Sequence, residues 1–178
     1  KQTMNEIIKK NGINFGIITG IISVLITTSI YIIDLSLMTK WWVGISILAF
    51  YIIIGCILLV KTKKDMGGFM NFKDGFTTYF ISALIGIAIS VVFNILLYNV
   101  IDPEAADTLK QMTLKSTAEM MKNFGAPSSE IKKAIEKMEN YDQFSTIEQL
   151  KGSIWSVIGA TIFGLILAAI FKKNKPVF

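Results

Sequence analysis

Hydrophobic positions along the chain gather into four runs that contain no charged residue: 13–33, 41–60, 76–101 and 152–171. An α-helix needs about 20 apolar residues to cross a hydrocarbon core of roughly 30 Å, and each run is long enough. We therefore predict an all-α integral membrane protein with four transmembrane helices. The first run is interpreted as a retained span, since it is too long for a signal peptide and no small-residue cleavage site follows it.

The one sizeable polar segment, 102–151, separates the third and fourth runs, and its pattern predicts two helices folded as a hairpin. Asp102 is a favourable N-cap for the first helix, and Gly125 supplies a left-handed C-cap. The second helix is predicted to begin at Ser128 or Ser129. Residues 145–148 read Ser-Thr-Ile-Glu, a capping box that starts the last helix before its apolar part. The chain thus divides into 1–101, 102–151 and 152–178.

Lysines are distributed unequally between the two sides of the predicted bundle. The side that holds both termini and the 61–75 loop carries ten of the lysines and three of the acids, and the opposite side carries eight lysines and ten acids. Because lysine-rich segments stay in the cytoplasm, we predict cytoplasmic termini and an extracytoplasmic 102–151 hairpin. The residues interpreted as topology anchors are Lys61, Lys63, Lys64, Lys172, Lys173 and Lys175.

The 61–75 loop is more heterogeneous than any other part of the chain. Its Gly67-Gly68 pair does not fit a phosphate-binding loop, which needs G-x-x-x-x-G-K-[ST] between a strand and a helix. Phe69, Phe72 and Phe76 have helical spacing, which predicts a short interfacial helix leading into the third span. Binding of lipid headgroups by the loop lysines is the alternative to a purely topological role.

Small residues repeat every four positions in three of the four runs, the spacing that lets membrane helices approach closely. The second run has no such stripe, so we expect the other three to form the tight core and the second to be peripheral. The rival interpretation is that one stripe binds another protein. The stripes are Gly12, Gly16 and Gly20; Ser82, Gly86, Ser90 and Asn94; and Gly152, Ser156, Ala160, Gly164 and Ala168.

The segments "GGFMNFKDGF", "FNILLYNVIDPEAADTLKQMT" and "SSEIKKAIEKME", with a last span ending "FKKNK", resemble a bacterial family of small four-span inner-membrane proteins of unknown function. The most specific part is Asn99, Ile101, Asp102, Pro103 and Glu104 at the end of the third span. The resemblance covers essentially the whole chain. It implies a multi-pass protein of the bacterial cytoplasmic membrane and supplies no catalytic residue.

The residue types present argue against catalysis and against nucleic-acid binding. The chain has no histidine, and its single cysteine, Cys56, lies inside an apolar run. All of its basic residues are lysines. The chain therefore lacks arginine, the residue that forms bidentate hydrogen bonds with guanine and with phosphate. We therefore predict no enzymatic activity, no cofactor, no metal and no nucleic-acid partner.

Two functions remain open. The first is a membrane-embedded accessory protein, a non-catalytic subunit or stabiliser that contacts membrane lipid and other membrane proteins. The alternative is a small-solute or lipid transporter or lipid-handling protein. No run contains an acid or a lysine, and Asn94 is the only carboxamide well inside a span. Asn94 fits an interhelical hydrogen bond better than a selectivity role.

Overall fold

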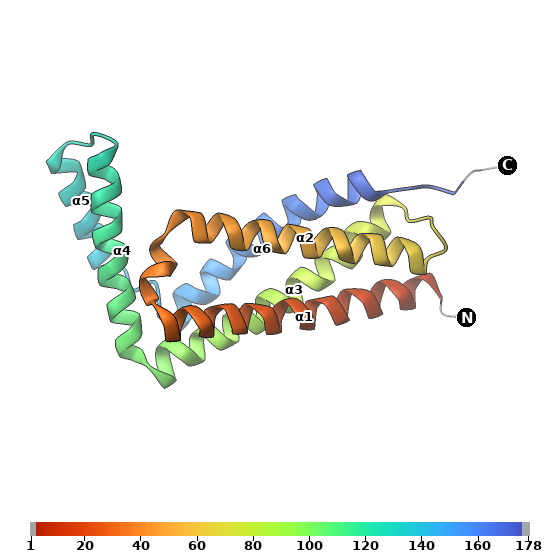
Figure 1. Cartoon of the computed structure of the whole chain (residues 1–178), viewed down its shortest axis with the longest axis horizontal. Coiled ribbons are helices and arrows are strands. Elements are labelled where there is room, and N and C mark those ends of the chain that lie inside the picture. The colour runs from red at the N-terminus through yellow and green to blue at the C-terminus, as the bar shows by residue number, and fades with distance from the viewer. Residues whose placement is uncertain (1–2, 176–178) are drawn as a thin grey trace.

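The computed structural model describes residues 3–175, and every regular element within that range is a helix (Figure 1). This confirms the predicted all-α fold class. A short 3-10 helix connects the first two long helices, and a π-helical turn follows the third. The elements are α1 (Met4–Ile33), the 3-10 helix η1 (Leu35–Thr39), α2 (Trp41–Asp65), α3 (Phe72–Leu96), the π-helix η2 (Leu97–Ile101), α4 (Pro103–Asn123), α5 (Ser128–Glu139) and α6 (Thr146–Phe171).

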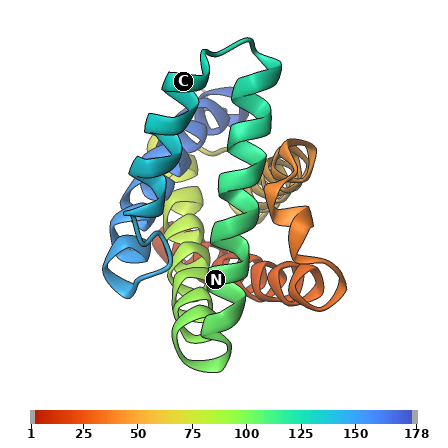
Figure 2. The same ribbon diagram turned by 90° about the vertical axis from the view of Figure 1, so that its left-hand side faces the viewer.

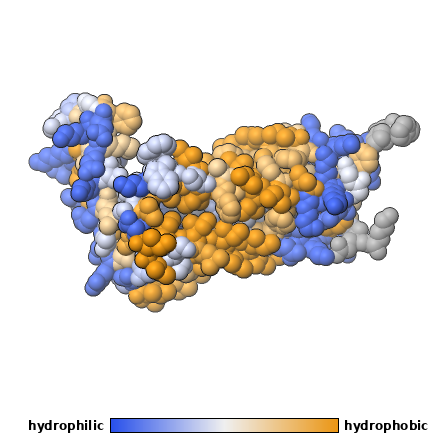
Figure 3. Space-filling view, in the orientation of Figure 1, coloured by the Kyte–Doolittle hydropathy of each residue, from blue (hydrophilic) through white to orange (hydrophobic). Residues whose placement is uncertain are grey.

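Four apolar helical segments form an elongated bundle and are long enough to span a membrane: α1, α2, α3 with η2, and α6. Figure 3 shows an apolar belt around the middle of the molecule with hydrophilic residues at both ends. We call the end that carries α4 and α5 the hairpin end, and the end that carries Lys61–Asp65 and residues 172–175 the lysine end. The belt and its two polar ends are those of a multi-pass membrane protein.

The α4–α5 hairpin lies across the hairpin end of the bundle, with α4 steeply inclined to the spans (Figures 1 and 2). Ala105, Ala106 and Leu109 of α4 are buried against Leu97 and Tyr98 of η2. Helix α5 packs on α4, and none of its residues is fully buried. The apolar side of α4 therefore fixes the hairpin to the bundle, while α5 remains an outer layer.

Helix α3 is the centre of the bundle, because α1 and α6 both pack extensively on it, and α2 makes smaller contacts with all three. The α1–α3 approach is close. A methyl group added at Gly16 would lie 2.7 Å from Cβ of Ile85, and one at Gly20 would lie 2.5 Å from Cδ1 of Ile89. Since atoms cannot approach so closely, only glycine at these positions permits this helix separation.

The connection between α2 and α3 differs from the predicted interfacial helix. Helix α2 continues through Asp65 and α3 begins at Phe72, so residues 66–71 are the whole loop. Phe72 and Phe76 do share a face, and their rings stack at 6.5 Å, but they belong to α3 itself. The prediction of a separate helix was wrong because helical spacing identifies a shared face without locating the start of the helix.

Backbone pairing holds the 66–71 loop to the C-terminal tail. Met70 and Lys173 exchange two backbone hydrogen bonds, of 2.9 and 2.8 Å, and form an isolated antiparallel bridge. The ammonium of Lys173 lies 5.5 Å from the ring centroid of Phe69, within cation–π range. Gly67 and Gly68 adopt φ of +80° and +88°, which lets the chain reverse directly after α2.

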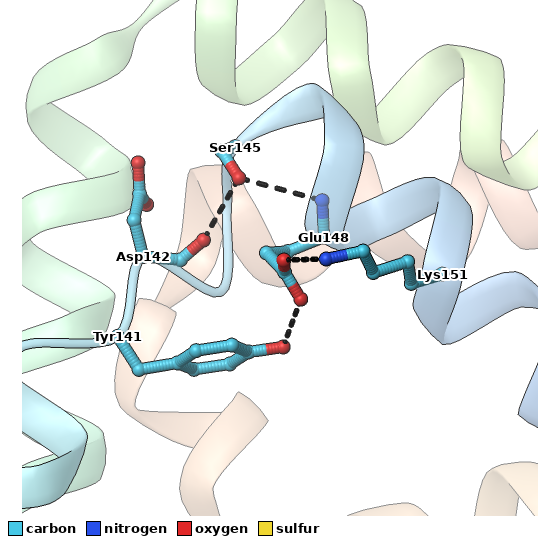
Figure 4. Close-up of polar contacts among 5 residues, drawn as sticks. All are labelled: Tyr141, Asp142, Ser145, Glu148 and Lys151. Atoms are coloured by element: carbon cyan, nitrogen blue, oxygen red, sulfur yellow. Dashed lines mark hydrogen bonds and ion pairs between the residues drawn. The ribbon is translucent and has the colours of Figure 1, made fainter.

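The α5–α6 loop is fixed to the first turn of α6 (Figure 4). The Ser145 hydroxyl accepts from the backbone N–H of Glu148, so α6 begins at the predicted N-cap. The Glu148 carboxylate accepts from the Tyr141 hydroxyl at 2.6 Å and from the Lys151 ammonium at 2.6 Å. These contacts set where the last span starts.

We expect Gly16→Leu to destabilise the bundle, because the added side chain would have to displace Ile85 of α3. Overpacking of this kind costs about 1–3 kcal/mol or more. The matched control is Gly152→Leu, since no atom lies within 4 Å of a methyl group added there. Thermal unfolding in detergent should show a lower melting temperature for Gly16→Leu alone; equal melting temperatures would contradict the close α1–α3 contact.

Candidate functional site

A cavity of about 460 Å³ lies at mid-depth in the bundle, and all four spans contribute to its wall. No charged residue lines it. The wall is built largely from aliphatic, aromatic and small side chains together with several hydroxyls. Its lining residues include Thr19, Ser23, Gly44, Leu48, Tyr51, Gly55, Tyr79, Ser82, Ala83, Gly86, Ser90, Ser156, Gly159, Ala160 and Phe163.

The cavity exists because α2 and α6 pack tightly only toward the lysine end. All buried residues of α2 lie between Ile54 and Thr62, and all buried residues of α6 lie between Gly164 and Ala168. Toward the hairpin end, α2 exposes Trp41 and α6 exposes Trp155, by 76% and 74%. The two helices therefore leave space between them and α3 in the remaining part of the bundle.

Tyr79 of α3 marks the point where this space closes. A methyl group added at Gly55 of α2 would lie 2.7 Å from Cε2 of Tyr79, and one at Gly164 of α6 would lie 2.7 Å from its Cδ1. The tyrosine ring thus contacts a glycine on each neighbouring helix. We call these three residues the Tyr79 clamp. Gly55 and Tyr79 also line the cavity, so the clamp forms part of its wall at the lysine end.

Several hydroxyls of the cavity wall, among them those of Thr19, Ser23 and Ser90, are bonded within the protein. The Ser23 hydroxyl donates to Ser90 Oγ at 2.8 Å, and this bond joins α1 to α3. The Thr19 hydroxyl donates to the backbone carbonyls of Phe15 and Gly16 at 2.9 and 3.0 Å. The wall is mostly apolar and holds no charged residue, so the cavity favours an apolar molecule with few polar groups.

The predicted stripes have different environments in the structure. Gly12, Gly16 and Gly20 are buried against α3, as are Ser82 and Gly86 of α3 within the bundle. The α6 stripe is divided: Gly164 and Ala168 are buried, Ala160 is half-buried, and Gly152 and Ser156 are exposed. Several small or aromatic cavity residues, among them Gly44, Gly55 and Tyr79, lie outside every predicted stripe.

Asn94 is half-buried and does not line the cavity. The hydrogen bond between spans that its stripe provides is made one turn earlier, from Ser23 to Ser90. Cys56 is a free, half-buried thiol on α2. Among residues 3–175, no group of three or more His, Cys, Asp or Glu side chains is placed to hold a metal ion.

The six lysines predicted as topology anchors all lie near the lysine end. Lys63 and Lys64 occupy the last turn of α2, where their positive charges interact favourably with the negative end of the helix dipole. Lys61 pairs with Asp65, with its Nζ 2.7 Å from Oδ2. Lys172 and Lys175 are exposed in the segment that follows α6.

The π-helical turn η2 joins the third span to the hairpin and makes the outer corner, formed by Tyr31, Tyr98, Asn99 and Asp102. The Asp102 carboxylate accepts from the Tyr31 hydroxyl of α1 at 2.7 Å and from the backbone N–H of Ala105 at 3.0 Å. Asn99 donates to the Phe144 carbonyl at 2.9 Å. The Tyr98 hydroxyl lies 3.4 Å from Sδ of Met38. The corner therefore ties α1, η1, α4 and the α5–α6 loop together.

A family model described as "Protein of unknown function (DUF4199)" matches residues 14–173. No curated protein and no solved structure matches the chain.

The hydrogen bond from Tyr31 and the N–H of Ala105 hold the pKa of Asp102 below its ordinary value of 3.8. A lowered native pKa means that this carboxylate stabilises the fold above its unfolded pKa and loses that effect as pH falls through the native value. We expect Tyr31→Phe to melt at a lower temperature than the wild type at pH 7, and the difference to shrink below pH 3.8. Thermal unfolding at pH 7 and pH 3 checks this; an unchanged difference would assign Tyr31 to packing alone.

Proposed function

Since the chain belongs to the DUF4199 family of proteins of unknown function, we propose a function from its geometry: it is a membrane-embedded protein that binds an apolar molecule, such as a lipid chain, in the mid-depth cavity. The observation that carries this proposal is the uncharged cavity of about 460 Å³ whose wall comes from all four spans. Ligand sites in proteins have volumes of roughly 300–1,000 Å³ and mostly apolar walls.

The chemistry of the wall selects the class of occupant. Ion-coupled transport usually needs an ionisable group near the middle of the membrane, and no acid or lysine lines this cavity. An apolar chain loses nothing by leaving the lipid for such a wall, whereas a charged solute would lose its hydration without compensation. The sequence left open an accessory protein and a transporter or lipid-handling protein. Of these, the geometry of the cavity favours a lipid-handling protein.

The proposed setting is a bacterial cytoplasmic membrane with both termini in the cytoplasm. The observation that supports the orientation is the concentration of lysines at one end, the end where Met70 pairs with Lys173. The hairpin end, with its balance of lysines and acids, is then extracytoplasmic. The proposed activity is binding without catalysis, consistent with a chain that contains no histidine and one half-buried cysteine.

An accessory role with a partner protein is the second candidate, and the divided α6 stripe favours it. Gly152 and Ser156 have the spacing of a helix-packing stripe but are exposed. In the membrane such residues allow a second helix to approach closely. A partner helix seated on this face would complete the packing that α2 does not provide.

To test the cavity, Ala160→Phe should fill it and reduce the retained lipid or other apolar ligand by at least about tenfold, since aromatic rings occupy more than the methyl group they replace. Ile162→Phe is the matched control, because Ile162 is 54% exposed and does not line the cavity. Native mass spectrometry of the purified proteins measures the bound molecule. Equal retention by the wild type and Ala160→Phe, with both folded, would overturn the proposal.

To test the accessory role, the protein is crosslinked in its native membrane and purified in mild detergent. We expect a stoichiometric partner with the wild type and its loss from Gly152→Leu, whose own melting temperature should be unchanged because the site is open. Recovery of the protein alone after crosslinking would exclude the accessory role and leave the cavity proposal intact.

A further inference from the structure

A second cavity, of about 630 Å³, lies at the lysine end between the start of α1, the end of α2 and the C-terminal tail. It shares no lining residue with the mid-depth cavity, so an inference from it does not rest on the proposed function. Its wall combines three lysines with two asparagines, one carboxylate and several apolar side chains. The lining residues are Met4, Ile7, Lys10, Asn11, Asn14, Lys61, Asp65, Met66, Gly67 and Lys175.

A hydrogen-bond network that begins at the buried side chain of Asn11 forms one wall of this cavity. Asn11 is 3% exposed, and its Nδ2 donates to Thr62 Oγ1 at 3.2 Å and to Asp65 Oδ2 at 2.9 Å. The same carboxylate oxygen accepts from Lys61 Nζ at 2.7 Å. Asp65 is thus bonded to α1 and to its own helix, and it holds the ammonium of Lys61 at the cavity wall.

The charges of the wall favour an anion. Three ammonium groups line the cavity with one carboxylate, and that carboxylate is already bonded to Lys61 and Asn11. Lys10 and Lys175 therefore add positive charge that Asp65 does not neutralise. Lysine binds phosphate as a mobile point charge, and basic pockets between membrane helices on the cytoplasmic side bind phosphate headgroups.

The position of the cavity and its apolar residues indicate the source of the phosphate. Figure 3 shows the hydrophilic lysine end directly beside the apolar belt. In a membrane, such a boundary lies where lipid headgroups meet hydrocarbon. Met4, Ile7 and Met66 line the cavity beside the lysines and supply apolar contact for the part of a lipid below its phosphate. A free phosphate ion would gain nothing from these three side chains.

We propose that this cavity binds the phosphate of an anionic phospholipid headgroup, with Lys10, Lys61 and Lys175 as the charged ligands. The assignment separates the lysines of this end into two groups. Lys61 belongs to the site, whereas Lys64 and Lys172 lie outside it and act only through their charge. The sequence alone could not make this distinction, because Lys10 and Lys175 are far apart along the chain.

The test uses the full-length protein in nanodiscs and in detergent, with phosphatidylglycerol as the anionic probe and phosphatidylcholine as the zwitterionic one. The test variant is Lys10→Gln/Lys175→Gln, which leaves the Lys61–Asp65 pair intact. The control is Lys64→Gln/Lys172→Gln, which removes the same charge from the same end outside the cavity. Native mass spectrometry measures lipid retained by each protein.

We expect the wild type to retain phosphatidylglycerol in preference to phosphatidylcholine, and the test variant to bind it about 30-fold more weakly, since each lysine near an anionic lipid adds roughly fivefold. The control variant should lose at most about twofold in affinity for phosphatidylglycerol, because the two lysines that it removes act on the lipid only through screened, longer-range charge. The proposed site would be overturned if the test and control variants lost the same affinity for phosphatidylglycerol. It would also be overturned if the wild type retained both lipids equally. Displacement of the lipid by inorganic phosphate would overturn the lipid source.

A single Lys175→Gln variant guards against loss of folding, because Lys175 is exposed and follows the last helix. It should retain the wild-type melting temperature and lose about fivefold in lipid binding. A Lys175→Gln protein that binds the lipid as well as the wild type would remove Lys175 from the proposed site.

Discussion

The close approach of α1 and α3 is the constraint on which the rest of the bundle depends. Gly12, Gly16 and Gly20 leave room for Ile81, Ile85 and Ile89 of α3, so the two backbones pack at a distance that side chains would forbid. In a membrane, where lipid is as apolar as leucine, such contact supplies packing energy that burial cannot. Since α1 occupies one face of α3 along its length, α2 and α6 pack on what remains, and both contact Tyr79 of the clamp.

The clamp forms the wall of the mid-depth cavity toward the lysine end. Gly55 and Gly164 contact opposite edges of the Tyr79 ring, so α2 and α6 both approach α3 closely at this level. Toward the hairpin end, no comparable contact joins α2 to α6 among the described residues, and the helices follow their own directions. There α2 and α6 expose Trp41 and Trp155 and leave the space that the cavity occupies.

Much of this fold is predictable from the sequence, and the limits have physical causes. Charge-free runs predict spans, and Asp102 and Ser145 predict helix starts, because these signals act within a few neighbouring residues. The sequence could not predict that the α6 stripe is buried at one end and exposed at the other. Small residues at regular spacing show which positions share a face of the helix, but not over what length another helix packs on that face. The Met70–Lys173 bridge is formed by backbone atoms, so it leaves no residue pattern. Gly55 and Tyr79 belong to no repeat of small residues at four-residue spacing, so the sequence pattern does not indicate their contact.

The two ends of the bundle differ in how their polar groups are used, and this bears on where ligands can bind. At the hairpin end, the side chains of the outer corner satisfy one another: Asp102 accepts from Tyr31 and from the α4 backbone, and Asn99 donates to the Phe144 carbonyl. At the lysine end, one buried asparagine and one carboxylate organise the wall, and two lysines beside it have no carboxylate of their own within the cavity. The polar groups of the outer corner are bonded to one another and stabilise the fold, whereas the excess of ammonium groups at the lysine end attracts an anion. The proposed anionic-lipid site rests on this excess of lysines over carboxylates at the lysine end.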